Sequence, residues 1–158
     1  MKLTMTAIRN LHDVSLEFLT ISLSETIEVS YFDDGIRAGF PSPANDFQEL
    51  KISFDKEVFG TSPSTIFCAR VIGDSMKNLG IDSGDTIVVD RILEPQDGDI
   101  CVAVINNDFT LKTIKIEKDC VWLMPANENY KPLQVTEDDD FSVWGIVTHT
   151  LKYHRKRR

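Results

Sequence analysis

The first residue in this sequence with a chemical use is a serine that follows a sharp turn. Ile66–Ile72 is rich in β-branched and apolar residues, which predicts a buried strand. Gly73 then allows backbone conformations that other residues resist, and Asp74 and Ser75 follow it. Such a turn can present a hydroxyl and a free backbone N–H, which a nucleophile and an oxyanion hole need. Most Gly-Asp-Ser sequences are only turns, so these residues alone do not establish catalysis.

Lys112 is the candidate base for that serine. It lies in Asp108–Ile116, which is typical of a strand, and the alternation of a strand places it on one face with Thr110 and Ile114. A lysine among aliphatic side chains commonly extends its amine to solvent. If it is buried instead, its pKa falls and the amine becomes a base. The pattern leaves both alternatives open.

Several short motifs, in chain order, resemble the self-cleaving serine peptidases of the LexA/UmuD type, the peptidase S24 family. They are Gly73-Asp74-Ser75-Met76, Gly84-Asp85, Asp97-Gly98-Asp99 and Phe109-Thr110-Leu111-Lys112. Upstream, Ala38-Gly39-Phe40-Pro41-Ser42-Pro43-Ala44 resembles the cleavage-site segment of the UmuD members. The resemblance runs from about Gly35 to Leu151. It implies a mostly β fold, a compact peptidase domain of short strands with an extended N-terminal arm.

The resemblance also implies a Ser-Lys dyad, with Ser75 as nucleophile and Lys112 as general base. Backbone N–H groups at Asp74 and Ser75 would stabilise the oxyanion, and the substrate would be the chain's own Ala38–Gly39 bond. Two small residues before Pro41 suit an extended segment that approaches a nucleophile closely. Without the downstream pair, the same residues would fit a flexible linker. No cofactor and no metal are implied.

The family further implies a set of partners. The trigger for cleavage would be the RecA filament on single-stranded DNA. The product would be a homodimer that joins a Y-family translesion polymerase subunit in SOS mutagenesis, part of the DNA-damage response. The alternative is a LexA-like or phage-type regulator without a DNA-binding domain, which self-cleavage inactivates. The arm shows no pair of amphipathic helices with a glycine turn, so we expect no direct sequence-specific DNA binding.

Composition bounds the remaining classes. The chain has 158 residues, 42% of them hydrophobic, and a net charge of −8, which predicts one globular domain and disfavours broad nucleic-acid binding. No signal peptide or membrane-spanning run is evident, so the expected location is cytoplasmic. Three widely spaced cysteines match no zinc pattern and are expected to be buried free thiols. Basic residues gather at the C-terminus, where a solvated end or contact with an acidic partner or nucleic acid would explain them.

The predicted organisation has four parts. Residues 1–38 form the arm that self-cleavage removes, and residues 39–65 form a linker with short helices over Ser42–Leu50 and over Asp55–Phe59, the latter capped by Ser53. Residues 66–151 form the peptidase domain and residues 152–158 the basic tail. The predicted strands of the domain are Ile66–Ile72, Thr86–Asp90, Ile100–Ile105, Phe109–Ile116, Val121–Met124 and Phe141–Thr150.

Other residues suggest two rival sites. A Ser-His-Asp triad would need a histidine near Ser75, and His149 is the candidate, although an isolated histidine is usually structural. Aspartates in two turns could suggest calcium, but the twelve-residue loop pattern is absent. They are Asp82, Asp85, Asp97 and Asp99.

Overall fold

A computed structural model describes residues 4–6, 16–20, 28–32, 49–60 and 63–155. These residues form eleven strands, one short α-helix and two 3₁₀ turns. In chain order the elements are β1 (Thr4–Thr6), β2 (Leu16–Thr20), β3 (Glu28–Phe32), β4 (Glu49–Ser53), α1 (Phe54–Phe59), η2 (Pro63–Thr65), β5 (Ile66–Val71), η3 (Lys77–Leu79), β6 (Thr86–Asp90), β7 (Ile100–Ile105), β8 (Asp108–Ile116), β9 (Val121–Met124), β10 (Leu133–Val135) and β11 (Phe141–Leu151). The fold is mostly β, as the sequence predicts.

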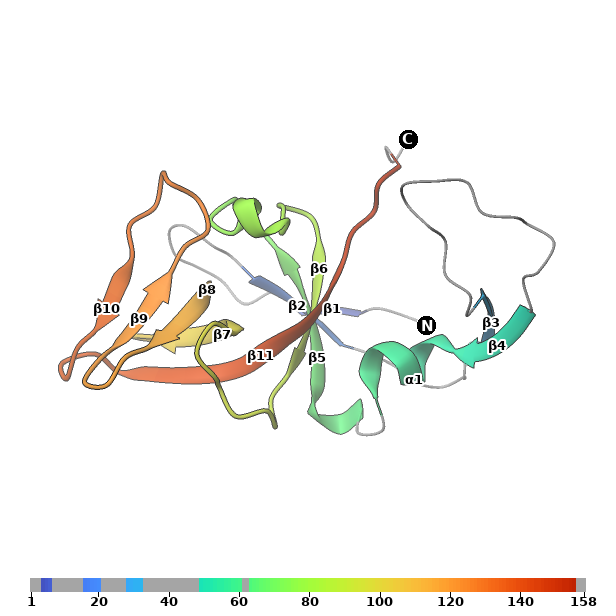
Figure 1. The fold of residues 1–158 in the computed structure, drawn as a ribbon, viewed down its shortest axis with the longest axis horizontal. Coiled ribbons are helices and arrows are strands. Elements are labelled where there is room, and N and C mark those ends of the chain that lie inside the picture. Colours follow the sequence, from blue (N-terminus) through green and yellow to red (C-terminus); the bar gives the residue numbers. More distant parts are fainter. Residues whose placement is uncertain (1–3, 7–15, 21–27, 33–48, 61–62, 156–158) are drawn as a thin grey trace.

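Nine of the strands form one antiparallel sheet in the order β1-β2-β5-β6-β11-β7-β8-β9-β10. Figure 1 shows that β11 runs through the middle of the molecule and joins its two halves. The N-terminal part of β11 pairs with β7 and its C-terminal part pairs with β6. The pairing partner of β11 therefore changes along its length, from β7 to β6. The remaining two strands, β3 and β4, form a separate antiparallel pair.

Gly145 lies where β11 passes between these partners. The register of β11 with β7 shifts between Val143 and Gly145. A Cβ atom at Gly145 would lie 2.6 Å from Cγ1 of Val89 and 3.0 Å from the carbonyl oxygen of Asp90. The close approach of β6 to β11 at this point therefore requires a residue without a side chain.

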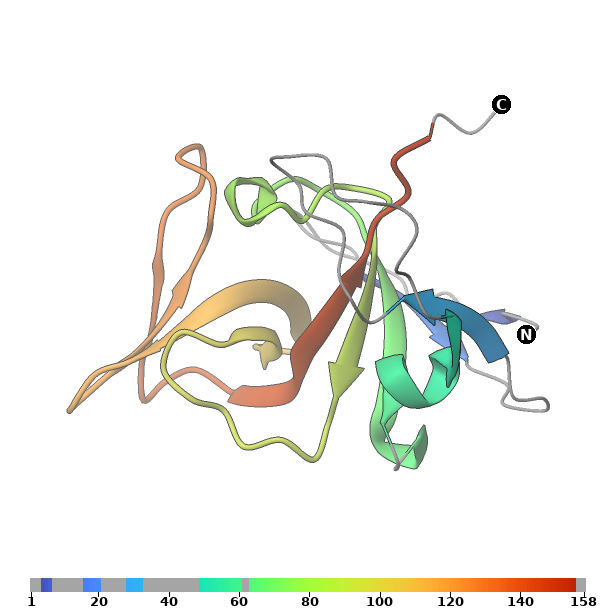
Figure 2. The same ribbon diagram turned by 45° about the vertical axis from the view of Figure 1, so that its right-hand side comes forward.

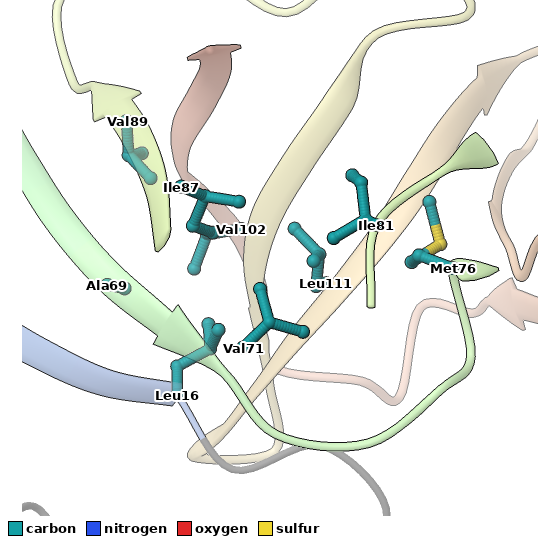
Figure 3. Close-up of a cluster of buried hydrophobic side chains, with 9 residues drawn as sticks. All are labelled: Leu16, Ala69, Val71, Met76, Ile81, Ile87, Val89, Val102 and Leu111. Atoms are coloured by element: carbon teal, nitrogen blue, oxygen red, sulfur yellow. The ribbon is translucent and has the colours of Figure 1, made fainter. Parts of the chain in front are cut away.

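The core consists of three clusters of apolar side chains. The largest contains residues from the two strands that lead to the candidate dyad, and Figure 3 shows it in close-up. Its buried members are Leu16, Ala69, Val71, Met76, Ile81, Ile87, Val89, Val102 and Leu111. The second cluster lies under α1, and the third lies between β7, β8, β9 and β11. All three clusters draw on the β-branched runs that predicted the strands.

The predicted elements correspond closely to the observed ones from β5 onward, with strand ends shifted by at most one residue. The predicted helix through Leu50 is wrong, because Glu49–Ser53 is β4 and pairs with β3; residues 42–48 of that prediction lie outside the described residues. The predicted helix after Ser53 is confirmed as α1. Ser53 stands at its N-cap position, but its hydroxyl donates to the carboxylate of Asp55 instead of accepting a backbone N–H.

Within the part of the chain that the structure describes, no helix has the length and apolar character needed to cross a membrane.

Candidate active site

Ser75 lies in the turn that directly follows β5. Gly73 has a φ of +106°, a value that costs glycine little and other residues much, so the chain can reverse sharply there. Met76, the residue after the serine, is 1% exposed and packs in the largest core cluster. Ser75 itself is 2% exposed. The turn is therefore anchored by the core immediately beside the candidate nucleophile.

Lys112 projects from β8 towards this turn. Its Nζ lies 3.1 Å from Oγ of Ser75, 3.0 Å from Oγ1 of Thr110 and 3.0 Å from the carbonyl oxygen of Leu111. The structure thus brings together the two side chains that the sequence singled out, although 37 positions separate them. The sequence left open whether the Lys112 amine extends to solvent or is buried. In the structure the amine is directed at the serine, and Lys112 is half-buried.

This geometry suits proton transfer between the two groups. A nucleophile and its base must lie within hydrogen-bond reach, about 2.6–3.2 Å. A neutral amine has two N–H donors and one lone pair. If the N–H groups donate to Thr110 and to the Leu111 carbonyl, the lone pair of Lys112 faces the Ser75 hydroxyl. The arrangement can therefore take a proton from the serine without moving the lysine.

The segment after β9 supports the turn from the other side. Nδ2 of Asn127 donates to the carbonyl oxygen of Asp74 at 3.0 Å and to its carboxylate at 3.2 Å, and the Tyr130 hydroxyl donates to the same carboxylate at 2.6 Å. The backbone N–H of Ala126 donates to the carbonyl oxygen of Ser75 at 2.8 Å. Asn127 is 8% exposed. The candidate nucleophile and the residue before it are thus both tied to one distant segment.

Sequence reasoning missed this support. Asn127 lies 53 positions and Tyr130 lies 56 positions from Asp74, and a polar residue after a strand usually indicates only a turn. The pairing of β8 with β9 brings the segment to the site, because β9 ends at Met124, opposite Thr113 of β8.

The predicted oxyanion donors, the backbone N–H groups of Asp74 and Ser75, belong to the same turn. The scissile pair, Ala38 and Gly39, lies outside the described residues. Its flanks are described: β3 ends at Phe32, β4 begins at Glu49, and these two residues are register partners. The connection that contains the predicted scissile bond therefore begins and ends at the same point of the fold.

The rival sites have other roles in the structure. His149 lies on β11 opposite Val88 of β6, and its Nδ1 is 3.0 Å from Oγ1 of Thr148. Three of the aspartates that could suggest calcium accept backbone N–H groups: Asp85 from Asp82 and Asp99 from Gln96 within their turns, and Asp97 from Ile116 at the end of β8.

The basic tail begins with a residue that is engaged within the chain. Lys152 forms ion pairs with Asp82 and Asp85, in the turn that precedes β6. These contacts hold the end of β11 against that turn, so Lys152 is not a simple solvated charge.

Two of the cysteines, Cys68 and Cys101, are buried. Burial raises the pKa of the Cys101 thiol to about 12; the charge of Asp99 adds to this rise and that of Lys112 opposes it. Burial likewise raises the pKa of Cys68 to about 11. Cys101 lies directly opposite Lys112 in the pairing of β7 with β8. A protonated thiol at that position is not a counter-ion for an ammonium group, whereas a thiolate would be. All three cysteines are free, as predicted, but the prediction that all are buried is wrong for Cys120, which is half-buried.

A curled antiparallel sheet with a serine turn beside a strand lysine is consistent with one family of peptidases, and the family comparison agrees. Residues 30–148 match the model of the family described as Peptidase S24-like. The chain belongs to this peptidase family.

The chain is also similar to individual proteins of known name. It is 34% identical over 139 residues to Protein MucA of Salmonella typhimurium, which covers 87% of this chain and 93% of that protein. It is 37% identical over 117 residues to Protein SamA of Salmonella typhimurium strain LT2, with 74% and 80% covered. It is 38% identical over 120 residues to the LexA repressor of Stenotrophomonas maltophilia, with 76% of this chain but 56% of the repressor covered.

Proposed function

We propose that this protein is a UmuD-like peptidase that cleaves its own Ala38–Gly39 bond with Ser75 and Lys112. The observation that carries the proposal is the 3.1 Å separation of Lys112 Nζ and Ser75 Oγ in a chain of the S24 family. Similarity to MucA and SamA over most of their length supports a function of the UmuD kind.

The reaction has two stages. Ser75 Oγ bonds to the carbonyl carbon of Ala38 while its proton moves to Lys112 Nζ, which leaves a tetrahedral oxyanion facing the backbone N–H groups of the turn. The intermediate collapses, the bond to the nitrogen of Gly39 breaks, and Lys112 gives its proton to the departing amine. Water then bonds to the carbonyl carbon of the Ser75 ester while Lys112 accepts its proton. The bond between that carbon and Ser75 Oγ breaks, Lys112 returns the proton to Ser75 Oγ, and the chain ending at Ala38 leaves as a carboxylic acid that ionises in water.

In this proposal the RecA filament on single-stranded DNA favours the cleavage-ready conformation and supplies no catalytic group. The product, a homodimer of residues 39–158, joins a Y-family translesion polymerase subunit in SOS mutagenesis. The LexA match supports a second candidate, a regulator that self-cleavage inactivates. Capture of a polymerase subunit by the cleaved chain favours the first candidate, and binding of a repressor or DNA that depends on the uncut arm favours the second.

The test of the chemistry uses the intact chain without any filament. A solvated lysine has a pKa of about 10.4, so only about one in 2,500 is neutral at pH 7, and cleavage that needs a neutral amine should speed up as pH rises. Intact mass and N-terminal sequencing should show a new fragment that begins at Gly39. Ser75→Ala, Lys112→Ala and Lys112→Arg should produce none, the last because arginine keeps its proton.

The buried thiols set the upper end of the pH range. Their pKa values are raised in the fold from an ordinary value of 9.0, so the stability that they contribute is complete below about pH 9 and is lost as pH rises towards 11 and 12. The assay therefore runs from neutral pH to about pH 9, with circular dichroism recorded at each point. A cleavage rate that stays flat over this range in folded protein, or cleavage by the arginine variant, contradicts the proposal.

A further inference from the structure

Part of the arm that cleavage would remove is a strand of the main sheet. β2 lies before the proposed scissile bond in the chain, and it pairs antiparallel with β5 through four register pairs, from Leu16 opposite Val71 to Leu19 opposite Cys68. β5 is the strand that leads into the Ser75 turn. The arm is therefore not only a tether for the cleavage site.

The side chains of β2 are buried on both faces of the sheet. Leu16 is 5% exposed and packs with Val71 and Met76 in the largest cluster, where Figure 3 shows it. Leu19 is 4% exposed and belongs to the second cluster, with Val58 and Phe59. A strand with apolar contacts on both faces is bound by more than its backbone hydrogen bonds.

Phe18 adds a third attachment. Its ring lies 5.0 Å from that of Phe109 and 4.8 Å from that of Trp144, both in edge-to-face geometry. These rings belong to β8 and β11, beyond the strands that neighbour β2 in the sheet. Phe18 therefore links the arm to the half of the fold that carries Lys112.

A second strand pair also spans the proposed cut. β3 precedes Ala38 and β4 follows Gly39, and the two pair through five register positions. Figures 1 and 2 show this pair at the side of the molecule away from β9 and β10. Hydrolysis at Ala38–Gly39 would break the chain between β3 and β4 and would leave both strand pairs intact.

We propose that the 1–38 fragment remains bound after cleavage, as a second chain that occupies the edge of β5 through β2 and the edge of β4 through β3. Hydrolysis alone does not expose the β5 edge in this proposal. Dissociation of the strands exposes that edge, together with the apolar surfaces that Leu16, Phe18 and Leu19 cover. The surface is an edge-strand site whose occupant is the chain's own N-terminal segment. This inference rests on the proposed self-cleavage for its biological occurrence.

The experiment cuts the chain without using Ser75. A recognition sequence for a site-specific protease is inserted between Gly39 and Phe40 of the full-length Ser75→Ala protein, and the chain is cut at micromolar concentration. Size-exclusion chromatography and native mass spectrometry should then find both pieces together, at the mass of the uncut chain plus one water. Quantitative separation of the pieces on the column overturns the inference.

Variants test whether β2 is the attachment. Phe18→Ala with Leu19→Ala should release the fragment at least tenfold more readily than the parent, after melting curves show that the uncut variant is folded. Glu17→Gln is the matched control on the same strand, because it keeps the size and the backbone pairing of Glu17 and removes only the charge from a long ion pair with Arg70, 3.8 Å, which contributes little. The assignment to β2 is overturned if the double variant retains the fragment as well as the parent does. It is also overturned if the Glu17→Gln control releases the fragment as readily as the double variant does.

Hydrogen exchange provides a measurement that needs no variant. The Val71 amide donates to Asp85, so the amides of β5 that report on β2 are the alternate ones, Cys68 and Arg70. They should stay as protected in the cut chain as in the uncut chain, and rapid exchange there contradicts retention. Self-cleavage of the wild type is measured in parallel. If the wild type never cuts itself, the proposed function fails while the protease-cut result stands. If it cuts itself and loses the fragment at once, only this inference fails.

Discussion

Replacing Asn127 with alanine should slow self-cleavage without touching the dyad. The amide of Asn127 donates to the backbone carbonyl and the carboxylate of Asp74. Because Asp74 directly precedes the candidate nucleophile, these two bonds fix the direction in which the turn presents the Ser75 hydroxyl. Asn127 is therefore a positioning residue in the proposed reaction.

The two distances set the size of the effect. The bond to the neutral carbonyl, at 3.0 Å, is worth about 1 kcal/mol, and the bond to the carboxylate, at 3.2 Å and near solvent, lies towards the lower end of about 1.5–3 kcal/mol. Together they contribute about 2–3 kcal/mol to the geometry of the turn. Since each 1.36 kcal/mol is a factor of ten, complete loss from the transition state would slow cleavage about 30- to 160-fold.

The assay follows the loss of the intact chain at about pH 9 and at a temperature well below the melting transition of every variant. Asn129→Ala is the matched control, since the described contact of Asn129 with Asn127 uses its backbone N–H and its side chain is exposed. Asn127→Asp should be at least as slow as alanine, because it keeps the size but puts a carboxylate beside that of Asp74.

Two outcomes would refute this reasoning. One is that folded Asn127→Ala cleaves itself at the wild-type rate. The other is that Asn129→Ala slows cleavage as much as Asn127→Ala does. Tyr130→Phe gives a further check: it acts through the same Asp74 carboxylate, so its effect and that of Asn127→Ala should combine to less than their sum. The rise of cleavage with pH should keep its shape in all these variants, because none of them alters Lys112.

Three other predictions concern the framework. Gly145→Ala should lower the free energy of unfolding by about 1–3 kcal/mol, measured by urea denaturation, because its methyl group would overlap Val89; unchanged stability would show that β6 and β11 separate easily. Lys152→Met should melt below wild type at neutral pH, with the gap closing as pH rises above 10.5, since hydrogen bonds to Asp82 and then Asp85 raise the Lys152 pKa and stability from a raised pKa is lost at higher pH; a constant gap would contradict the ion pairs. Cys101 should resist alkylation by iodoacetamide at pH 8 in folded protein, where its pKa of about 12 leaves about one thiolate in ten thousand, while half-buried Cys120 reacts first; peptide mapping that finds the reverse order would contradict the burial.

Apart from β10, the strands from β5 onward could be predicted because each carries its own signal. Runs such as Ile100–Ile105 are β-branched, short and bounded by turn residues, so they can be recognised from the local sequence. β10 and β4 were not predicted for the opposite reason. Leu133–Val135 has only three residues and owes its state to pairing with β9, and Glu49–Ser53 owes its state to β3.

The residues of the candidate site also differ in whether the local sequence identifies them. Ser75 and Lys112 stand in motifs with a recognisable local sequence, so the pair could be predicted from the sequence alone. Asn127 and Tyr130 have no such motif, and their contacts arise because the pairing of β8 with β9 brings distant residues to one turn. Chain length likewise could not show that β2, inside the predicted arm, is a buried strand of the sheet.

The pairing of β3 with β4 also limits how the proposed bond can reach Ser75. From sequence alone, the residues between Ala38 and Ser75 could span roughly 100 Å when extended, which would permit cleavage within one chain from almost any arrangement. With Phe32 fixed opposite Glu49, Ala38 is only six residues from a fixed point, so its reach is about 20 Å.

Cleavage within one chain therefore requires the Ser75 hydroxyl to lie inside that radius of the end of β3, or requires β3 to leave β4. If the hydroxyl lies inside the radius, the rate should be independent of protein concentration, and lengthening the connection between Phe32 and Ala38 with glycine and serine should slow it, since a longer loop meets the nucleophile less often. If it lies outside, the same insertion should speed cleavage, because it extends the reach. A rate proportional to concentration, unaffected by the insertion, would mean that the bond which Ser75 cuts belongs to another copy of the chain.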